Sequence, residues 1–393
     1  MSQRTIAIVA GTRPEIIKLA PVYRTLRMSD DMDVRWIHTG QHADMAWDML
    51  RCFGIVPDAQ LHRTGTTLEE FSTGCRTQLD VLRSREAWDA CVVQGDTESA
   101  FVGALSSFYG RVPVVHVEAG LRTRDLERPF PEEGIRQMIS RIAALHLAPT
   151  ERARQALLAE GVEPQRIRVT GNTVVDAQLW VCSLYGIRRQ QGPDRGHILV
   201  TAHRREHWGR DMEETFHAVA DIAAAYPATH VLFPVHLNPA VQKPAREILG
   251  RLPNVSLVAP LDYLGMQRAL ANARLLLTDS GGLQEEAPTF HVPTLVLRRE
   301  TERPEAVEAG CAELVGPGRA DIVAATRRLM DDPDAAAAMR DVANPFGDGH
   351  AAERVLQAMQ ELLGLQRARP QLQVLRGVGA GAVAARHQPH GRA

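Results

Sequence analysis

The sequence contains very little lysine. Lys18 and Lys243 are its only lysines, so nearly all of the 45 basic residues in this chain of 393 are arginines. A coding preference for arginine is the simplest explanation for the basic complement as a whole. It leaves open why position 18, directly after the stretch "AIVAGTRPEII", keeps a lysine.

Long apolar runs and a large net charge are missing as well. No apolar stretch approaches the roughly 18 residues that a membrane span requires, and the N-terminal residues lead into a strand-like run without a signal-peptide core. A net charge of −2 provides no general attraction to nucleic acid or to an anionic membrane. We therefore expect a cytoplasmic protein that holds any anionic ligand with a local cluster of cations.

Motifs that would identify several common enzyme classes are absent. The five cysteines are odd in number and form no CxxC pair, so we expect reduced thiols and neither a disulfide framework nor a thiolate zinc site. The histidines are scattered and no HExxH occurs, which argues against a catalytic metal. The chain has no GxSxG elbow, and without a Walker motif or a complete GxGxxG, neither ATP nor a dinucleotide is the expected ligand.

The chain does contain a regular alternation of short apolar runs with helix-length segments, which is typical of parallel sheets joined by right-handed crossovers. Twelve strands would be unusually many for one open sheet, whereas two sheets of about six match the length of two domains. We predict an α/β fold with two doubly wound Rossmann-like domains facing a cleft. The predicted strands cover residues 5–10, 34–38, 90–93, 114–117, 145–148, 167–169, 197–201, 230–235, 255–258, 274–278, 294–297 and 312–315.

The predicted domain boundary lies near "VTGNTVVDAQLW", where a strand ends and a helix starts at about Thr173. Residues 1–172 would form the N-terminal domain and residues 173–345 the C-terminal one. A helix within 346–366 shows leucine and methionine at helical spacing, and we expect it to pack back toward the N-terminal domain. Residues 367–393 lack a sustained period and are rich in Arg, Ala and Gly, so we expect a disordered tail.

Polar residues follow nearly every predicted strand, at the edge where open parallel sheets bind ligands. The segment "DSGGLQEEA" follows a strand and opens a helix, so the N–H groups of Ser280, Gly281 and Gly282 are suited to a diphosphate. An ordinary glycine turn with Ser280 as N-cap is the alternative. Arg13, His203 and Arg204 would add positive charge, or they could instead form surface ion pairs.

Three carboxylates also follow this pattern. Asp96 and Glu118 each lie just beyond an apolar run, and Glu132 follows "RPFP" at a predicted helix start. A single such carboxylate most often caps a helix or pairs with an arginine. Three near one cleft indicate proton transfer, and burial with mutual repulsion would raise the pKa of at least one of them.

Together these segments resemble the non-hydrolysing UDP-N-acetylglucosamine 2-epimerases, which share the two-domain GT-B-like fold. The matching stretches run in the family's order from Gly11 to Gly310 and cover both predicted domains. They are "GTRPEIIKLAPV", "TGQH", "VQGDT", "HVEAGLRT", "PFPEEGIRQMIS", "VTGNTVVDA", "TAHRRE", "PVHLNP", "TDSGGLQEEAP" and "ETERPEAVEAG".

The resemblance implies reversible epimerisation of UDP-N-acetylglucosamine to UDP-N-acetylmannosamine, through elimination of UDP to a glycal and its re-addition. It implies no cofactor, a homodimer, and a product used for surface polysaccharide. A hydrolysing epimerase that releases free N-acetylmannosamine and UDP is one alternative. A GT-B glycosyltransferase would share the fold and the SGG turn but would need an acceptor.

The resemblance also implies residue roles, by match to the family's motifs. The catalytic set comprises Asp96, Glu118, Glu132 and His203. The substrate- and UDP-binding set comprises Arg13, Lys18, Ser280, Gly281, Gly282, Glu286 and Arg303, with Glu286 suited to the ribose hydroxyls. Further sugar or second-site contacts would come from Gln41, His42, Arg204 and His236.

Three positions depart from the family's pattern. Asp44 and Gly65 stand where the family has a glutamine and an arginine that bind a second, activating substrate molecule, so the pattern argues against such activation. Met266 replaces an aromatic residue near the uracil. Lys18 keeps its family position, and a compact ammonium near carboxylates and UDP could act where a bulky guanidinium cannot.

Overall fold

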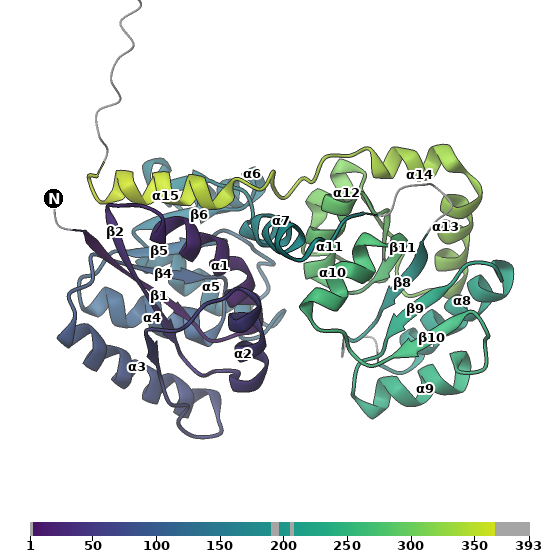
Figure 1. Cartoon of the computed structure of the whole chain (residues 1–393), viewed down its shortest axis with the longest axis horizontal. Helices are drawn as coiled ribbons and strands as arrows, with labels where there is room; N and C mark the ends of the chain where they lie inside the picture. Colours follow the sequence, from purple (N-terminus) through teal and green to yellow (C-terminus); the bar gives the residue numbers. More distant parts are fainter. Residues whose placement is uncertain (1–2, 190–195, 205–207, 366–393) are drawn as a thin grey trace, which may run out of the picture.

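The computed structural model describes residues 3–189, 196–204 and 208–365, with only the backbone described at 43–45. Thirteen strands in this part of the chain form two parallel sheets, so the predicted α/β fold with two doubly wound units is confirmed. The expected disordered tail, residues 367–393, lies outside the described residues. Figure 1 shows the two sheets side by side, each between helices.

The first sheet has seven strands in the order β3-β2-β1-β4-β5-β6-β7. Because the strand order reverses between β1 and β4, their carboxyl ends border the crevice where doubly wound sheets bind ligands. Six of these strands match predicted ones, and β3 is a two-residue strand that the sequence pattern missed. The bounds are β1 Arg4–Ala10, β2 Met32–His38, β3 Ala59–Gln60, β4 Ala90–Gln94, β5 Val114–Val117, β6 Leu145–Ala148 and β7 Ile167–Val169.

Helices cover both faces of this sheet because its strands are apolar on both sides. Ile6 and Ile8 of β1 join a core cluster with α1 and α2, whereas Ala7 and Val9 join another with α3, α4 and α5. We call the first sheet with its helices the first lobe. These helices are α1 Arg13–Arg27, α2 Ala43–Cys52, α3 Leu68–Arg85, α4 Glu98–Tyr109, α5 Glu132–Ile142, α6 Glu151–Ala159 and the 3-10 turn Pro164–Arg166.

The second sheet has six strands in the order β10-β9-β8-β11-β12-β13, with the reversal between β8 and β11. We call it, with its helices, the second lobe. Its strands are β8 His197–Thr201, β9 Val231–Pro234, β10 Val255–Val258, β11 Ala273–Thr278, β12 Thr294–Val296 and β13 Ala312–Leu314. Its helices are α8 Arg210–Ala225, α9 Pro239–Leu249, α10 Tyr263–Ala271, α11 Gly281–Glu286, the 3-10 turn Ala287–Phe290, α12 Pro304–Ala309, α13 Arg319–Asp331 and α14 Pro333–Arg340.

Two segments cross between the lobes. Helix α7 (Thr173–Tyr185) packs on α1 of the first lobe and on α10 and α11 of the second. The chain then returns after α14, and α15 (Ala351–Leu362) packs on α1 and α7, as the last helix in Figure 1 shows. The two crossings meet where the Asn172 N–H donates to the Phe346 carbonyl at 2.7 Å. The domain boundaries at residues 172 and 345 stay predictions.

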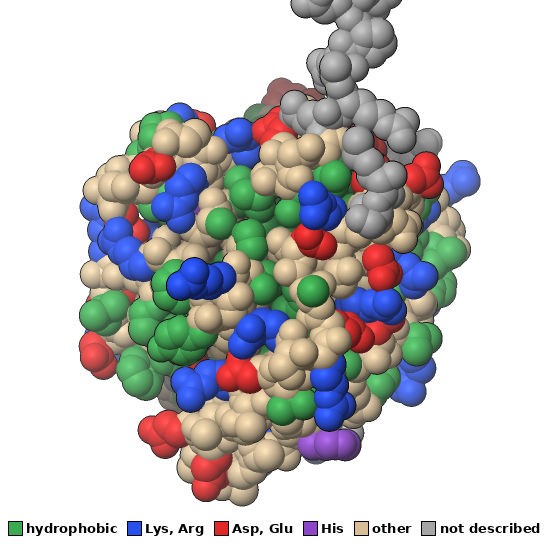
Figure 2. All heavy atoms as spheres, turned by 90° about the vertical axis from the view of Figure 1, so that its left-hand side faces the viewer, with side chains coloured by type: hydrophobic (Ala, Val, Ile, Leu, Met, Phe, Trp, Pro, Cys, Tyr) green, Lys and Arg blue, Asp and Glu red, His purple; other side chains and the backbone are tan. Residues whose placement is uncertain are grey.

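The outer face of the first lobe carries basic and acidic side chains interspersed with small apolar groups (Figure 2). Among the larger exposed apolar side chains of this lobe are Phe108 and Tyr109, at the end of α4, and Val81 on α3. Helix α3 packs on α4. In the described part of the chain, no helix combines the length and apolar character needed to cross a bilayer.

Candidate functional site

Two adjoining cavities lie at the carboxyl ends of the strands. The first, of about 560 Å³, is lined mainly by the first lobe, and the second, of about 460 Å³, mainly by the second lobe. Pro14, Lys18 and Arg303 line both cavities, so the two spaces meet at these side chains. Their combined size suits a nucleotide sugar better than a free sugar.

The structure brings the predicted site residues together around these cavities. The first cavity is lined by Lys18, Gln41, His42, Asp96, Glu118, Glu132, Arg204 and Arg303. The second is lined by Arg13, Lys18, His203, His236, Ser280, Gly282, Glu286 and Arg303. Gly281 adjoins them, since a Cβ at that position would lie 3.8 Å from Arg204 and 3.9 Å from Arg303.

The turn at the start of α1 aims Lys18 at the junction. A Cβ at Gly11 would lie 1.8 Å from Thr39 Oγ1, so this glycine is required for close packing and not as part of a dinucleotide fingerprint. The N–H groups of Gly11 and Thr12 donate to the buried Glu15 carboxylate at 3.0 and 2.8 Å, which fixes the turn. Lys18 follows Glu15 by one helical turn.

Lys18 is the centre of a buried ionic network that spans the lobes. Its ammonium lies 2.5 Å from Glu118 Oε1, at the end of β5, and 3.1 Å from Glu285 Oε2, on α11. Glu285 also pairs with Arg303, which precedes α12. The side chains of Lys18, Glu118, Glu285 and Arg303 are between 1% and 13% exposed, so solvent screens these charges weakly.

The network gives its two glutamates different acidities. Burial raises the pKa of Glu118 above its usual range, and the nearby Lys18 only partly offsets this. Burial also acts on Glu285, but Arg303 and Lys18 more than offset it and lower the pKa of Glu285. Glu285 is therefore held as an anion, whereas Glu118 retains its proton to a higher pH than an ordinary glutamate, the direction expected for at least one of the three carboxylates.

The backbone holds Glu118 in an uncommon conformation. Its φ of 61° lies in the left-handed region, which costs a residue other than glycine about 1–2 kcal/mol. The side-chain amide of Gln94 donates to Glu118 Oε2, and that of Asn172 donates to Oε1 at 3.4 Å. These contacts fix the Glu118 carboxylate at the cavity wall.

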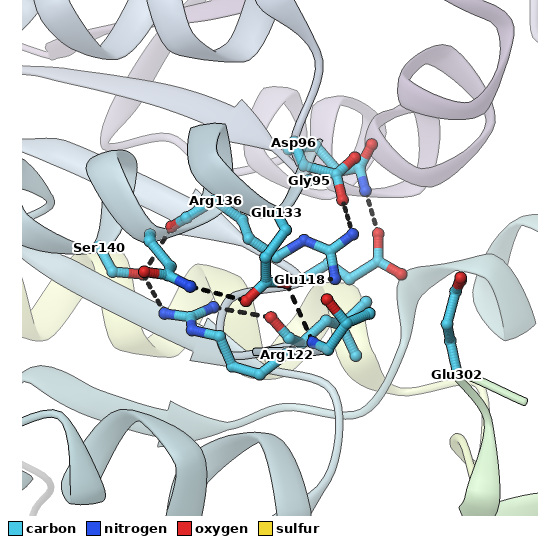
Figure 3. A network of polar contacts seen from close by, with 12 residues as sticks. Gly95, Asp96, Glu118, Arg122, Glu133, Arg136, Ser140 and Glu302 are labelled. Atoms are coloured by element: carbon cyan, nitrogen blue, oxygen red, sulfur yellow. Dashed lines mark hydrogen bonds and ion pairs between the residues drawn. The ribbon is translucent and has the colours of Figure 1, made fainter. Parts of the chain in front are cut away.

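Asp96, at the end of β4, is held by an arginine. Arg136 on α5 lies 2.6 Å from Asp96 Oδ2 and 3.4 Å from Glu133 Oε2. Figure 3 shows Asp96, Glu133 and Arg136 within one network of polar contacts. Glu133 is fully buried and accepts hydrogen bonds from the N–H groups of Thr123 and Arg124. The side chain of Asp96 is 27% exposed and lines the cavity, while Arg136 balances its negative charge.

Glu132 is the first residue of α5, which confirms the helix start predicted after "RPFP". Its Oε2 is buried and has no hydrogen-bond partner among the described residues, although it lines the first cavity. A buried, unpartnered carboxylate oxygen is costly unless a ligand or water meets it. Glu132 is thus available to a bound molecule.

The turn before α11 forms the cationic end of the site. Ser280 is the N-cap of α11, and the Arg204 and Arg303 guanidinium groups both lie near Gly281. Buried Asp279 accepts from the N–H groups of His203 and Arg204 at 2.7 and 2.8 Å, and its Oδ1 lies 3.0 Å from His203 Nδ1. N–H groups and guanidinium groups in this arrangement suit a diphosphate.

The remainder of the second cavity is suited to a nucleoside. Its lining includes apolar side chains from the segment before α10 and from α10 itself, among them Leu261, Tyr263 and Met266. Glu286 accepts a hydrogen bond from Gln267 Nε2 at 2.6 Å, and burial raises its pKa to about 7. A carboxylate beside an apolar pocket can select the hydroxyl groups of a ribose.

The second-site candidates have more varied surroundings. Gln41 Oε1 accepts from the N–H and hydroxyl groups of Ser99 at 3.0 and 2.6 Å. His42 is exposed at the N-cap of α2, and the ring of His236 stacks on that of His203, with centroids 6.2 Å apart. Within the described residues, no group of three or more His, Cys, Asp or Glu side chains is placed to hold a metal ion.

Sequence reasoning assigned no role to Glu285, Asp279 or Gln94, although each supports a predicted site residue. Glu285 and Glu286 are adjacent in "LQEEA", and only the structure shows that the first contacts Lys18 while the second contacts Gln267. The position of Asp279 and Gln94 beside strand ends was the available signal.

Comparison with known proteins gives a consistent result. Residues 24–360 match the family model described as UDP-N-acetylglucosamine 2-epimerase. The chain is 43% identical over 368 residues to UDP-N-acetylglucosamine 2-epimerase of Escherichia coli (strain K12), and the match covers 90% of this chain and 98% of that relative.

Solved structures agree in fold. The UDP-GlcNAc 2-epimerase from Neisseria meningitidis bound to UDP-GlcNAc superposes with a TM-score of 0.83 at 36% identity, covering 91% of this chain and 100% of that one. The enzyme from Methanocaldococcus jannaschii, in complex with UDP-GlcNAc and UDP, gives a TM-score of 0.74 at 31% identity, covering 92% and 100%.

Proposed function

The chain belongs to the UDP-N-acetylglucosamine 2-epimerase family, and from this premise we propose that it interconverts UDP-N-acetylglucosamine and UDP-N-acetylmannosamine without net hydrolysis. The observation that carries the proposal is that Asp96, Glu118 and Glu132 line one cavity, which meets the cationic turn at Lys18 and Arg303. Proton-transfer groups on one side and a diphosphate site on the other are what the reaction requires.

The chemistry explains why both halves are needed. The hydrogen on carbon 2 is not made acidic by a neighbouring ketone, so its removal must be coupled to loss of a leaving group. A base takes this proton, the C–H electrons form the double bond between carbons 1 and 2, and UDP departs with the electrons of the C1–O bond. UDP then adds back to carbon 1 while carbon 2 receives a proton on the opposite face.

Two different groups must serve the two faces of the sugar ring. We assign proton transfer to the set of Asp96, Glu118 and Glu132, with no division into base and acid among them. Burial moves the pKa of Glu118 up from its ordinary value toward neutral pH, which favours a role in proton transfer. The unpartnered oxygen of Glu132 favours a direct contact with the substrate.

The departing UDP must be stabilised and also retained. We assign this to Arg13, Arg303, the Ser280 to Gly282 turn and His203, which together present N–H donors and positive charge to a diphosphate. Glu286 would bind the ribose and the apolar lining the uracil. Retention of UDP distinguishes an epimerase of this type from one that releases free sugar.

The test is incubation with UDP-N-acetylglucosamine in heavy water, with carbon 2 followed by NMR. We expect deuterium at carbon 2 and a mixture of both UDP-sugars. Free N-acetylmannosamine with UDP would instead identify a hydrolysing epimerase. Absence of exchange, with transfer of the sugar to an added acceptor, would identify a glycosyltransferase.

We further propose that the chain works as a homodimer in the cytoplasm and supplies activated N-acetylmannosamine for surface polysaccharide. The exposed Phe108, Tyr109 and Val81 on neighbouring helices support a self-association surface on the first lobe. Light scattering after size-exclusion chromatography tests this. A dimer that Tyr109→Glu converts to a monomer is the expected result, and a monomeric wild type would contradict it.

A further inference from the structure

Glu285 has a position that the proposed chemistry does not use directly. It comes from the second lobe, is 1% exposed, and lies 3.1 Å from the Lys18 ammonium of the first lobe. Its other oxygen pairs with Arg303, one of the proposed diphosphate ligands. Glu285 is thus a buried anion shared by Lys18 and Arg303. Its position is well defined, because a buried cation that loses its anionic partner destabilises the fold.

Glu285 also connects the two ends of the site. On one side, Lys18 contacts both Glu285 and Glu118, so the direction of the ammonium depends on both carboxylates. On the other side, Arg303 lies beside Gly281 in the diphosphate turn. A continuous series of ion pairs therefore connects the proton-transfer cavity with the diphosphate turn, from Glu118 through Lys18 and Glu285 to Arg303.

We propose that Glu285 is a positioning residue, which holds Lys18 on Glu118 across the lobes and aims Arg303 at the diphosphate. This inference rests on the proposed epimerase function and adds a residue to which that function assigns no role. Glu285 acts through Lys18 and Arg303, and it has no part in proton transfer itself.

Removal of the Glu285 charge would change Glu118 in a defined direction. The charged groups acting on Glu118 are Lys18, which lowers its pKa, Glu285, which raises it, and Arg303, which lowers it. Gln94 and Asn172 are the uncharged groups that hydrogen bond to it. Without the Glu285 anion, repulsion is lost and the attraction of both cations remains, so Glu118 ionises at lower pH.

The experiment compares Glu285→Gln with wild type in the heavy-water exchange assay over a range of pH. We expect kcat to fall at least about tenfold and the pH of the Glu118 ionisation to move down. We expect the Kd for UDP, measured by calorimetry, to rise, but by less than in Arg303→Gln, because Arg303 keeps its charge and loses only the partner that fixes its direction. Glu285→Asp should recover part of the activity.

Glu305 supplies the matched control. Its carboxylate also crosses the lobes, accepting from the Thr150 hydroxyl at 2.8 Å, and it is not in the described lining of either cavity. Glu305→Gln should leave the pH profile in place. If wild type shows no exchange at carbon 2, the proposed function fails. If wild type exchanges and Glu285→Gln keeps both its rate and its pH profile, the positioning role alone is wrong.

Discussion

The ammonium of Lys18 lies 2.5 Å from the carboxylate of Glu118, a residue 100 positions further along the chain. The two are brought together because α1 follows β1 and Glu118 directly follows β5, and the carboxyl ends of both strands lie at the same edge of one parallel sheet. Burial opposes the charge on Lys18, but Glu118 and Glu285 more than offset it and raise the pKa of Lys18. Lys18 is therefore a cation throughout the working pH range.

The first prediction concerns the shape of that cation. Lys18→Arg keeps the charge but places a planar guanidinium where a compact ammonium fits between Glu118 and Glu285. We expect turnover in the exchange assay to fall at least about tenfold while the far-UV spectrum is unchanged. The only other lysine, Lys243, is exposed on α9, so Lys243→Arg is the control and should behave as wild type. Normal turnover in Lys18→Arg would rule the idea out.

The second prediction separates proton transfer from nucleotide binding. Asp96→Asn and Glu118→Gln keep the size of the side chain and remove its ability to accept a proton. We expect each to lower kcat about 100-fold or more, with the Kd for UDP nearly unchanged. Loss of UDP affinity in both variants would contradict their assignment as acid and base groups.

The third prediction concerns the diphosphate end. Arg303 lines both cavities and lies near Gly281, whereas Arg299 of the same loop is exposed and pairs with Asp211. Arg303→Gln should weaken UDP binding by about tenfold or more, because a charge-assisted contact to phosphate is lost. Arg299→Gln, measured by the same calorimetry, should leave the Kd unchanged. Equal Kd values for both variants would remove Arg303 from the binding site.

The fourth prediction concerns stability and pH. Burial raises the pKa of Glu15 to about 7, from an ordinary value of 4.5. Between these values the folded state holds more protons than the unfolded state, so the free energy of unfolding falls as pH rises. The contribution is at most about 1.4 kcal/mol per pH unit. The amide introduced by Glu15→Gln cannot ionise. The stability of this variant, measured by thermal unfolding between pH 4.5 and 7, should therefore depend less on pH than that of wild type.

Glu70 is the matched control for that measurement. Its carboxylate likewise accepts backbone N–H groups at the start of a helix, but it is exposed, and hydrogen bonds from Thr67 and Thr66 lower its pKa. The stabilisation from Glu70 is present above its ordinary pKa and is lost as pH falls. In Glu70→Gln, the decrease in stability as pH rises toward 7 should therefore be the same as in wild type. An unchanged pH dependence in Glu15→Gln would contradict the buried-acid explanation.

The sequence predicts the strands well, because apolar runs bounded by polar residues carry the signal. All twelve predicted strands are present, with ends that differ by at most two residues. The two-residue strand β3 was missed because a run of that length has no pattern. The gathering of site residues was also predictable, since parallel strands place their carboxyl ends at one edge.

The contacts within the site could not be predicted. The positive φ of Glu118 depends on the residues packed around it. Because the residue is a glutamate and not a glycine, the sequence gives no sign of this conformation. Whether Glu285 or Glu286 faces Lys18 depends on the rotation of a six-residue helix. The requirement for Gly11 comes from Thr39, which is distant in sequence, so this glycine is needed for close packing and not for a dinucleotide fingerprint.

The burial of Lys18 also provides a means of observing the protein. With two lysines in the chain, an amine-reactive reagent has few targets: Lys243 lies on the surface, and Lys18 is enclosed between two carboxylates. Modification of Lys18 requires its ion pairs with Glu118 and Glu285 to break, so mass spectrometry of the labelled peptide measures how often this network opens. Lys243 in the same sample calibrates the reagent, and the ratio of the two signals reports opening without any introduced dye or tag.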